Sequence, residues 1–393
     1  MKLLIFSTVY YPDIIGGGEF STKLMTEGLI KKGYEVEVHA LGFSDCIENI
    51  NGVIVFRHYF KDISEEFLKR AKNNDLSNGG LSKWKKISNK HVDILYNRKW
   101  YHYYKEIIKK SSPDLIHSVS PLSYLGRFNC WKAAYDLGIP ISHVVRSPDL
   151  IEFAFGNGIF NKIYQSFNAR AAQYLSAIAA PSKYMLICHT KHNIKADICQ
   201  VIYNAIDIPI LKINRAIIEH KKEIILYAGD LRKEKGILTL YKAVYGKNLP
   251  YKLLFIGCGE LSEEVKHWKN VEVIHWMEQS KLYKYMGEAR IVILPSEWNE
   301  AFGRILIEAI ANGTLAIGSD CGGIPEVLNF DKRYIFQHGN IEQLFQKINR
   351  IKHLSNEEYY LELQEQQSWL VKFQKITYID NWEHFFLKQV NKG

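Results

Sequence analysis

The chain has 393 residues, of which 47% are hydrophobic and 24% charged, and its formal net charge is +9. This length exceeds one ordinary core and suits two α/β domains, and the composition is typical of a soluble globular protein. No stretch approaches the roughly 18 consecutive apolar residues of a membrane-spanning helix, so we do not expect an integral membrane protein.

The first residues place one positive charge, Lys2, before an apolar run, as a signal peptide does. Pro12 and Asp13 end that run early and no small-residue cleavage site follows, so we interpret it as a strand. The six cysteines are scattered, without CxxC pairs or metal-ligand spacing. Such a pattern indicates free thiols in a reducing compartment, and we expect a cytoplasmic protein.

Short apolar runs alternate with helical patterns along the first half, which predicts a parallel sheet with crossover helices. A predicted strand at 3–8 leads through a loop at 13–18 into a helix from Phe20 to about Lys32, which Gly33 ends. Further strands are predicted at 35–41, 115–118, 141–145, 177–180 and 199–202.

The same alternation restarts in the second half. Strands are predicted at 224–228, 252–256, 271–274, 291–294 and 315–317, and helices at 236–244, 261–268 and 302–311. Two such units in series predict two Rossmann-like domains. The charged stretch 208–222 lacks clear periodicity, so we place the linker there. The last segment, about 369–387, is helical and aromatic, and it either packs back across the first domain or caps the second.

Positive charge concentrates at 61–110, where 13 Lys/Arg stand against 6 Asp/Glu. The runs 83–86 and 100–105 mix basic and aromatic residues. This mixture suits an anionic membrane surface or an anionic acceptor, and it also suits nucleic acid. A solvated helix face is an equally good interpretation of the charge.

Two glycine-containing turns are candidate anion sites. Gly16-Gly17-Gly18 lies between the first strand and its helix, where the backbone can approach a ligand and the helix N-terminus offers N–H groups to an anion. The pattern is not GxGxxG, and a plain strand-to-helix turn stays an alternative. In the second turn, residues 229–236, Arg232 and Lys235 can clamp a diphosphate, unless the turn is only a charged surface loop.

Residues 295–308 form the strongest motif. A strand ends at Pro295, a loop holds Glu300, and a helix opens near Phe302 and holds Glu308 in its second turn. Glu300 can accept hydrogen bonds from sugar hydroxyls, and Glu308 can accept a bidentate pair from a ribose. The N–H groups between them face phosphates, as at any helix N-terminus.

Together with the glycine-rich run 318–326, these motifs resemble glycosyltransferase family 4, a group of retaining enzymes with the GT-B fold. The matching residues are Glu300 to Glu308 (Glu-x7-Glu), the turn 229–236 (Gly-Arg-Leu-x-x-Glu-Lys-Gly in the family) and the run 322–326, Gly-Gly-Ile-Pro-Glu. The first half is similar more loosely, through Tyr11-Pro12 with the three glycines, 113–117, 181–182 and 204–207. The resemblance covers nearly the whole chain.

The resemblance implies an α/β protein with two Rossmann-like domains that face each other across a cleft. Residues 1–208 would bind the acceptor, 209–370 the nucleotide sugar, and 371–393 would form a helix that crosses back to the first domain. Glu300 would hold the transferred sugar, Glu308 the donor ribose, and Lys235 would neutralise the leaving diphosphate. Further donor contacts are implied for Gly16, Gly17, Gly18 and Arg232 and for the backbone of Ala301, Phe302, Gly303, Arg304 and Ile305. The base would meet mostly backbone near 274–277.

Two positions depart from the family pattern. The Arg after the first glycine is Asp230 here, which removes one phosphate cation, and Arg232 is the candidate substitute. Where the family often has His-Asp, this chain has Arg146-Ser147. We assign Arg146 as a catalytic candidate that would bind an anionic sugar or a phosphate, with a structural ion-pair role as the alternative.

The chain contains no Asp-x-Asp, the motif that holds a metal in the other large glycosyltransferase class. We therefore expect no metal and no cofactor, with Lys, Arg and a helix dipole in the electrostatic role of the metal. His117 and His275 are general-base candidates without a supporting motif, and a satisfied or exposed histidine is the better interpretation of both.

These features predict a retaining glycosyltransferase that moves a hexosyl unit from a UDP- or GDP-sugar to a glycan or lipid-linked acceptor in surface polysaccharide synthesis. We expect it to be peripheral on the inner face of a membrane, bound there through 61–110, and to have no nucleic-acid partner. The alternatives are a nucleotide-sugar epimerase, and a non-catalytic subunit that binds a partner glycosyltransferase.

Overall fold

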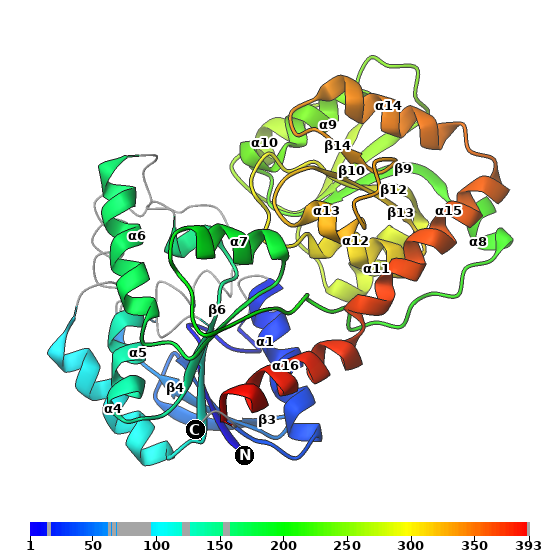
Figure 1. Cartoon of the computed structure of the whole chain (residues 1–393). Helices are drawn as coiled ribbons and strands as arrows, with labels where there is room; N and C mark the ends of the chain where they lie inside the picture. Colours follow the sequence, from blue (N-terminus) through cyan, green and yellow to red (C-terminus); the bar gives the residue numbers. More distant parts are fainter. Residues whose placement is uncertain are drawn as a thin grey trace. The chain divides into compact units, whose positions relative to one another are not determined.

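The computed structural model describes residues 1–13, 17–61, 64, 68, 96–119, 126–151 and 158–390. The chain folds into two compact units (Figure 1). The first is built from the chain up to Tyr203 together with Ile376–Gly393, and the second from Asn204–Lys375. The boundaries differ by a few residues from those predicted because Ile206 pairs with the returning chain: it forms a β-bridge with Gln374, and its N–H donates to the Phe373 carbonyl at 2.9 Å.

The described residues of the first unit hold an eight-stranded sheet in the order β3-β4-β2-β1-β5-β6-β7-β8, parallel except for β3 with β4. Its strands are β1 (Lys2–Phe6), β2 (Glu35–Leu41), β3 (Cys46–Ile50), β4 (Val53–His58), β5 (Leu115–Ser118), β6 (Ile141–Val144), β7 (Ala177–Ala180) and β8 (Ile198–Val201). Its helices are α1 (Gly17–Lys31), α4 (Arg98–Ser111), α5 (Arg127–Asp136), α6 (Ile159–Ala172), α7 (Lys183–Lys191) and α16 (Lys375–Val390), with a 3-10 turn at Pro148–Leu150.

The hairpin β3–β4 was not predicted from the sequence. Its turn is Asn51-Gly52, with φ of +52° and +90°, between Ile50 and Val53, which face each other across the hairpin. Two-residue hairpin turns of this kind need positive φ at both central positions, which Asn-Gly accepts at little cost. The Asn-Gly pair between two short apolar runs was therefore the available signal.

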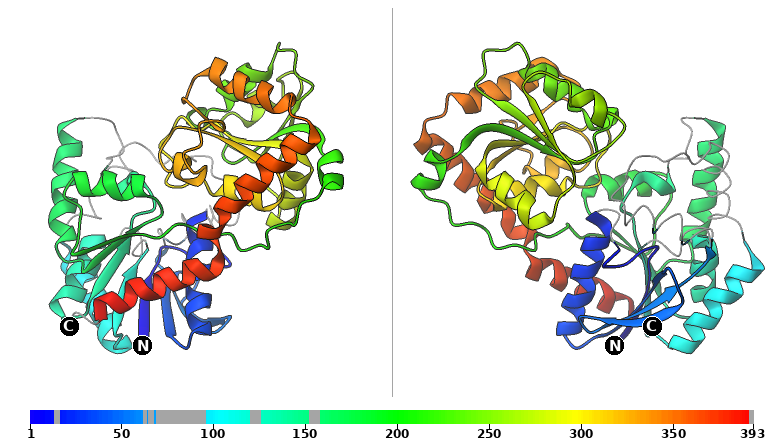
Figure 2. Two further views of the ribbon diagram at one scale, coloured as in Figure 1. Left: turned by 45° about the vertical axis from the view of Figure 1, so that its right-hand side comes forward. Right: turned by 180° about the vertical axis from the view of Figure 1, so that it is seen from behind.

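Helix α16 packs within the first unit, alongside α1 in both views of Figure 2. The Tyr378 hydroxyl donates to the Ser21 carbonyl at 2.9 Å, and the Trp382 ring lies 5.0 Å from the His117 ring. A Cβ on Gly28 would lie 2.4 Å from Ile379 Cδ1, so the two helices are in close contact there. The aromatic residues of α16 thus complete the core of the first unit, whereas Phe373, before the helix, packs on Phe302 in the second. A 3-10 turn, η3 (Trp369–Phe373), precedes the helix, where one continuous helix was predicted.

The second unit holds a parallel sheet, in its described residues six strands in the order β11-β10-β9-β12-β13-β14. The strands are β9 (Lys222–Ala228), β10 (Lys252–Ile256), β11 (Val271–Ile274), β12 (Ala289–Leu294), β13 (Leu315–Ser319) and β14 (Ile335–Phe336). The helices are α8 (Arg215–Glu219), α9 (Ile237–Val244), α10 (Ser262–Val265), α11 (Gln279–Glu288), α12 (Arg304–Ala311), α13 (Ile324–Val327), α14 (Ile341–Lys352) and α15 (Asn356–Ser368), with a 3-10 turn, η2 (Lys233–Lys235). In chain order this is the 3-2-1-4-5-6 arrangement of a doubly wound fold, whose strand order reverses between β9 and β12.

The stretch 208–222, predicted as the linker, is a structured part of the second unit. The Leu211 N–H donates to the Ala311 carbonyl at 2.8 Å, and α8 follows. Lys221 is buried, and its ammonium donates to the Gly287 carbonyl at 2.8 Å and to the Thr314 hydroxyl at 2.7 Å. The sequence pattern could not show this, because the partners lie about 66 to 100 positions away.

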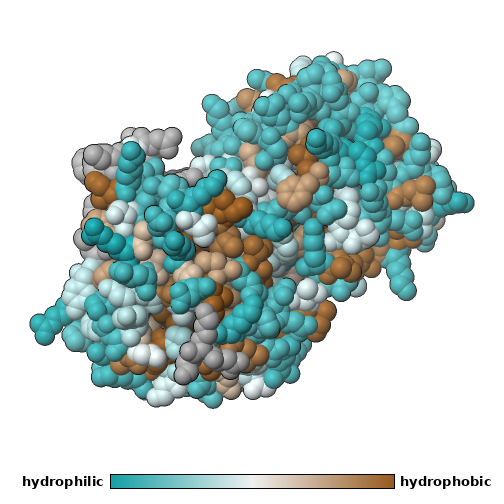
Figure 3. Space-filling view, viewed as in Figure 1, coloured by the Kyte–Doolittle hydropathy of each residue, from teal (hydrophilic) through white to brown (hydrophobic). Residues whose placement is uncertain are grey.

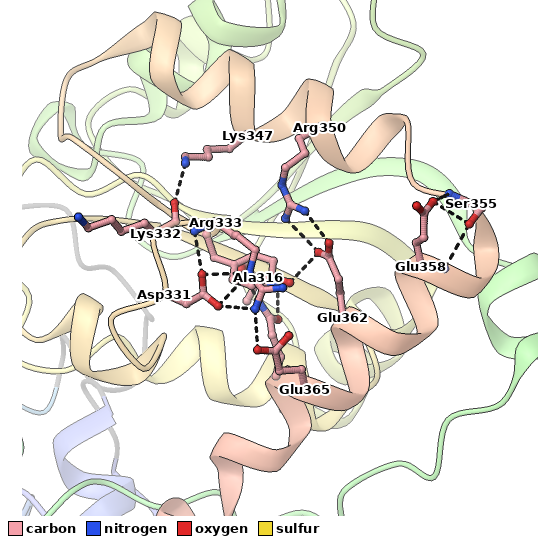
Figure 4. Close-up of polar contacts among 12 residues, drawn as sticks. Ala316, Asp331, Lys332, Arg333, Lys347, Arg350, Ser355, Glu358, Glu362 and Glu365 are labelled. Carbon is pink, nitrogen blue, oxygen red and sulfur yellow. Dashed lines mark hydrogen bonds and ion pairs between the residues drawn. The ribbon is translucent and has the colours of Figure 1, made fainter.

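An ion pair joins α14 and α15 on the second unit (Figure 4). Arg350 donates from both Nη atoms to the Glu362 carboxylate, at 2.5 and 3.0 Å. At the start of α15, Ser355 and Glu358 form a capping box, and Gln366 donates to the Ala316 carbonyl at 3.1 Å. These contacts hold the two helices against each other and α15 against β13.

Candidate active site

The predicted donor loops meet at the point where the strand order of the second unit reverses. Residues 229–236 follow β9, residues 295–303 follow β12, and the two strands are neighbours. The Glu297 N–H donates to the Glu234 carbonyl at 2.9 Å and so joins the loops. Gly236 has φ +70°, and a Cβ there would lie 1.9 Å from the Pro295 carbonyl oxygen, so only glycine permits this approach. The carboxyl ends of parallel strands at such a switch point are where open α/β sheets bind ligands.

Lys235 and Glu300 form an ion pair between these loops. The distance from Lys235 Nζ to Glu300 Oε1 is 2.7 Å, and the side chains are 17% and 19% exposed. The Ser296 hydroxyl donates to the same oxygen at 2.9 Å. Glu300 was predicted to bind the sugar of a donor and Lys235 its diphosphate, and the two side chains are in direct contact. Ser296 is an additional partner that the sequence analysis missed.

The glycine-rich run after β13 fixes the backbone of Glu300. Gly322 has φ +61°, and a Cβ there would lie 2.1 Å from the Glu300 carbonyl oxygen. The Gly323 N–H donates to that oxygen at 2.8 Å. The Gly-Gly pair therefore positions the loop that holds Glu300, which is a physical reason for its place in the motif.

Helix α12 begins at Arg304, with Gly303 as its N-cap at φ +96°, two residues later than predicted. Glu308 is buried. Its Oε1 lies 2.7 Å from Arg304 Nε in an ion pair and accepts a hydrogen bond from Gln279 Nε2 at 3.2 Å. Burial raises the pKa of the Glu308 carboxyl above its usual value, while Arg304 and Gln279 oppose that shift. The helix places Glu308 one turn after Arg304, and the first-turn N–H groups lie between Glu300 and Glu308 in the chain.

Arg232, the candidate substitute for the lost family arginine, is paired within its own turn. Its Nη2 lies 2.9 Å from Asp230 Oδ2, and its Nη1 lies 2.9 Å from Glu234 Oε1. Burial raises the pKa of Asp230, although Arg232 and Lys235 lower it. Two carboxylates thus neutralise the guanidinium charge of Arg232, whereas Lys235 has one carboxylate partner among the described residues, Glu300. Lys235 is therefore the better candidate for binding an anion at this turn.

A second glycine pair, after β10, supports the turn at 229–236 and was not identified in the sequence. A Cβ on Gly257 would lie 2.0 Å from the Gly229 carbonyl oxygen, and one on Gly259 would lie 2.5 Å from the Leu231 carbonyl oxygen. The Leu231 N–H donates to the Cys258 carbonyl at 2.9 Å. The sequence pattern that could have indicated this contact is Gly-x-Gly directly after a predicted strand.

In the first unit, Gly17 and Gly18 form the first turn of α1, and Gly16 lies outside the described residues. Arg146 follows β6, and its Nη1 donates to the Gly18 carbonyl and to the Thr22 hydroxyl, the latter at 2.8 Å. A Cβ on Gly18 would lie 3.3 Å from the same nitrogen. Arg146 and the glycine turn, predicted independently, are thus in contact, and the guanidinium binds the start of α1.

The two histidine candidates differ in their surroundings. His117 is buried: its Nδ1 lies 2.9 Å from the Ser142 hydroxyl oxygen, and its ring packs on Trp382 and Phe386. Burial holds its pKa well below the usual value. His275 is exposed directly after β11. His117 is therefore a core residue, as the sequence interpretation favoured.

Within the described ranges, Asp320, Cys321 and His338 form the one group of three ligand atoms close enough for a metal, all within 4.8 Å of one another. His338 Nδ1 already lies 2.7 Å from Asp320 Oδ1, and both side chains are substantially exposed. Burial raises the pKa of the Cys321 thiol to about 11, and metal binding needs the thiolate. The group therefore gives no reason to revise the expectation of a metal-independent site.

Of the basic segment 61–110, the structure describes Lys61, Ser64, Leu68 and 96–110, and the remainder lies outside the described residues. Across those residues and the rest of the described chain, no helix is both long and apolar enough to span a bilayer.

Comparison with known families matches both halves of the chain. Residues 211–367 match Glycosyl transferases group 1, and residues 15–209 match Glycosyltransferase Family 4. An uncharacterized 42.6 kDa protein in the cps region of Klebsiella pneumoniae is 26% identical over 348 residues, which cover 83% of this chain and 87% of that protein. An uncharacterized glycosyltransferase of Methanocaldococcus jannaschii is 24% identical over 376 residues, 84% of this chain and 83% of that protein.

Solved structures are similar over the whole length. The sucrose-phosphate synthase of Thermosynechococcus elongatus has a TM-score of 0.75 at 16% identity and covers 100% of both chains. Anabaena HepE, solved in complex with UDP and glucose, has a TM-score of 0.69 at 14% identity and covers 99% of this chain and 100% of its own. At such low identity the likeness shows the fold, and the fold class is GT-B, as predicted.

Proposed function

Because the chain belongs to glycosyltransferase family 4 and is a glycosyltransferase, we propose that it transfers a hexosyl unit, with retention of configuration, from a UDP- or GDP-sugar to a glycan or lipid-linked acceptor. The observation that supports this most directly is the Lys235–Glu300 pair at 2.7 Å, where the strand order reverses. A cation and a carboxylate held side by side match a donor whose anionic diphosphate and hydroxyl-bearing sugar are joined by one bond. HepE, which has been solved with UDP and glucose, supports the donor class.

In this proposal, Glu300 accepts hydrogen bonds from the sugar hydroxyls while Lys235 donates to the diphosphate. The Ser296 hydroxyl and the Gly323 N–H hold Glu300 in place before the donor binds. Such pre-organisation supplies electrostatic stabilisation without reorganisation during the reaction. Lys235 then stabilises the negative charge that grows on the diphosphate as the glycosidic bond breaks.

Glu308 and the first turn of α12 would bind the nucleoside part. Arg304 and Gln279 both contact Oε1 of Glu308, so a ribose diol would approach through Oε2. The backbone N–H groups of Arg304 and Ile305 begin the helix and offer the phosphates a positive dipole end. Arg304 itself orients Glu308, which is a role that the sequence did not indicate.

The chemistry needs no protein nucleophile in this scheme. The acceptor hydroxyl attacks the anomeric carbon on the face from which the diphosphate departs, and the leaving phosphate oxygen takes the hydroxyl proton. The bond from the anomeric carbon to the phosphate oxygen breaks as the new glycosidic bond forms, and the nucleoside diphosphate carries away the electron pair. Catalysis then consists of positioning and charge stabilisation.

We assign Arg146 to positioning instead of direct sugar contact. Its Nη1 donates to the Gly18 carbonyl and the Thr22 hydroxyl, and thereby holds the first turn of α1 against the carboxyl end of β6. This agrees with the structural alternative for Arg146, although its partners are a backbone carbonyl and a hydroxyl and not a carboxylate.

The test is a thermal-shift panel with UDP, GDP, ADP, CMP and their common sugar conjugates. A ligand at about 100 times its dissociation constant adds roughly 2.7 kcal/mol of stability. One nucleotide should stabilise the wild type and shift the Glu308→Ala variant much less. Glu362→Ala is the matched control, because Glu362 is another mostly buried carboxylate paired with an arginine, on α15 (Figure 4).

Glu362→Ala should lower the melting temperature but keep the full nucleotide shift. Equal nucleotide shifts in wild type and Glu308→Ala would refute the assignment of the ribose site. Conversion of the donor to an isomer in the absence of any acceptor would instead favour an epimerase. The anomeric configuration of the product, read by NMR coupling constants, tests retention.

A further inference from the structure

Nearly all of the net positive charge of the chain lies in the first unit. Residues 1–203 and 376–393 hold 28 Lys/Arg against 20 Asp/Glu, while residues 204–375 hold 23 against 22. Within the first unit, the three helices α4, α5 and α6 hold nine Lys/Arg against two Asp/Glu. Most of the net charge of +9 therefore lies on three helices, two of which are outside the basic segment identified in the sequence.

These three helices form one layer of the first unit. Helix α4 packs on α5, and α5 packs on both α6 and β6. Figures 1 and 2 show them next to one another along one edge of that unit, in cyan to green. The Tyr101 hydroxyl of α4 donates to Asp136 of α5 at 2.6 Å, and the rings of Tyr135 and Tyr174 lie 5.2 Å apart.

Both acidic residues of the layer are paired with lysines. Lys132 Nζ lies 2.8 Å from Asp136 Oδ2, and Lys109 Nζ lies 3.5 Å from Glu106 Oε1. The hydrogen bonds from Lys132 and Tyr101 lower the pKa of Asp136, although partial burial opposes that shift, so it stays ionised and its charge is compensated. The layer therefore presents a positive potential outward.

The outer side of α6 combines this charge with exposed apolar side chains. Ile163 and Phe167 are 48% and 38% exposed, and Lys162 and Arg170 are exposed beside them. The spacing of 162, 163, 167 and 170 places these residues on one side of the helix. Helix α6 contains no acidic residue. On α5, Tyr135 is 59% exposed.

We propose that the layer α4–α5–α6 docks on an anionic lipid bilayer, with Ile163 and Phe167 inserted among the acyl chains and the lysines and arginines at the headgroups. Basic residues around exposed aliphatic and aromatic side chains are the chemistry of interfacial binding. The two apolar side chains distinguish this partner from nucleic acid or a polyanionic glycan, since neither would bury an isoleucine. In the view of Figure 3, hydrophilic residues cover most of the second unit.

The proposal is independent of the donor assignment, because vesicle binding can be measured without any nucleotide sugar. It would bring the enzyme to a lipid-linked acceptor, but it does not require one. A membrane surface is one of the interpretations that the sequence analysis gave for the basic segment 61–110. The docking surface is now placed on α4, α5 and α6, which lie between Arg98 and Ala172.

The experiment is flotation of the full chain with vesicles of phosphatidylcholine alone and of phosphatidylcholine with phosphatidylglycerol. The wild type should float with the anionic vesicles only, and less at high salt. Lys162→Gln with Arg170→Gln should weaken binding about fivefold per charge removed. Ile163→Gln with Phe167→Gln should weaken it about tenfold while leaving the charge unchanged.

Matched controls lie on the second unit. Lys242→Gln with Lys269→Gln removes two exposed charges there, and Tyr245→Gln with Leu361→Gln removes two apolar side chains that are 51% and 54% exposed. Both controls should bind vesicles like the wild type, and all variants should melt within a few degrees of it. The proposal is overturned if the wild type does not float with anionic vesicles or if the Ile163/Phe167 variant binds unchanged. It is equally overturned if the wild type is a dimer by sedimentation and the only effect of the Ile163/Phe167 variant is to abolish that dimer.

Discussion

Gly322→Ala tests whether the glycine-rich run positions Glu300. Gly322 has φ +61°, and an added Cβ would lie 2.1 Å from the Glu300 carbonyl oxygen and 2.6 Å from the Glu300 nitrogen. Real Cβ atoms keep about 3 Å or more from such atoms, so the loop at 295–303 must move by about 1 Å. A misplacement of about 1 Å of a substrate-positioning group can cost roughly 100-fold in catalysis. We therefore expect kcat/KM for the donor to fall about 100-fold.

Gly339→Ala is the control that separates this steric effect from the cost of the backbone conformation. Gly339 has φ +71°, and nothing lies within 4 Å of an added Cβ. In both variants an alanine must adopt a left-handed backbone conformation, which lowers the free energy of unfolding by about 1 to 2 kcal/mol. Only Gly322→Ala should lose activity, measured as initial rates with nucleotide sugar at a temperature well below both melting transitions. Equal activity in the two variants would refute the reasoning.

Three further predictions concern charge. Asp230→Asn should lower KM for the donor several-fold, because Arg232 loses one of its two carboxylate partners; a KM that rises or stays constant contradicts this. Burial lowers the pKa of Lys221 from 10.5 to about 7. Between these pH values the unfolded chain binds one more proton than the folded chain, so the free energy of unfolding should rise with pH, by up to about 1.4 kcal/mol per pH unit. Urea midpoints should show this rise in the wild type but not in Lys221→Met. Turnover should be unchanged after chelation and dialysis against EDTA, and loss of activity that Mn²⁺ or Mg²⁺ restores would contradict a metal-independent site.

Several strands could be predicted from the sequence because they are short and largely apolar, and β5, β7 and β10 are buried over all or nearly all of their length. The strands at 35–41, 115–118, 177–180, 252–256 and 271–274 have the predicted bounds. A buried parallel strand needs hydrophobic side chains on both faces, so its ends are visible in the composition. The hairpin β3–β4 was missed because its strands are half exposed: β3 alternates little, and Ile47 on it is 66% exposed. The segment 208–222 was misplaced because its partners lie in distant parts of the chain.

The site residues were found through their motifs, but their partners were not. The sequence indicated that Glu300, Lys235 and Glu308 bind ligands, and it contained no information that Lys235 and Glu300 would pair. Arg232 illustrates the limit most clearly. Its charge was visible in the sequence, while its compensation by Asp230 and Glu234 depends on the side-chain geometry of a turn. Their roles in catalysis stay predictions until the variants above are measured.

The arrangement of glycines in the second unit is a physical argument for our prediction that the site needs no metal ion. A metal supplies a fixed positive charge, whereas a lysine on a flexible loop would have to be ordered during the reaction. Here Gly236, Gly257 and Gly322 each bring backbone so close to another loop that a Cβ would lie about 2 Å from a carbonyl oxygen. Four loops, which follow β9, β10, β12 and β13, are thereby fixed relative to one another, and the Lys235–Glu300 pair lies between two of them. The entropy of ordering the lysine has then been lost during folding, so its charge is already in place when the donor binds.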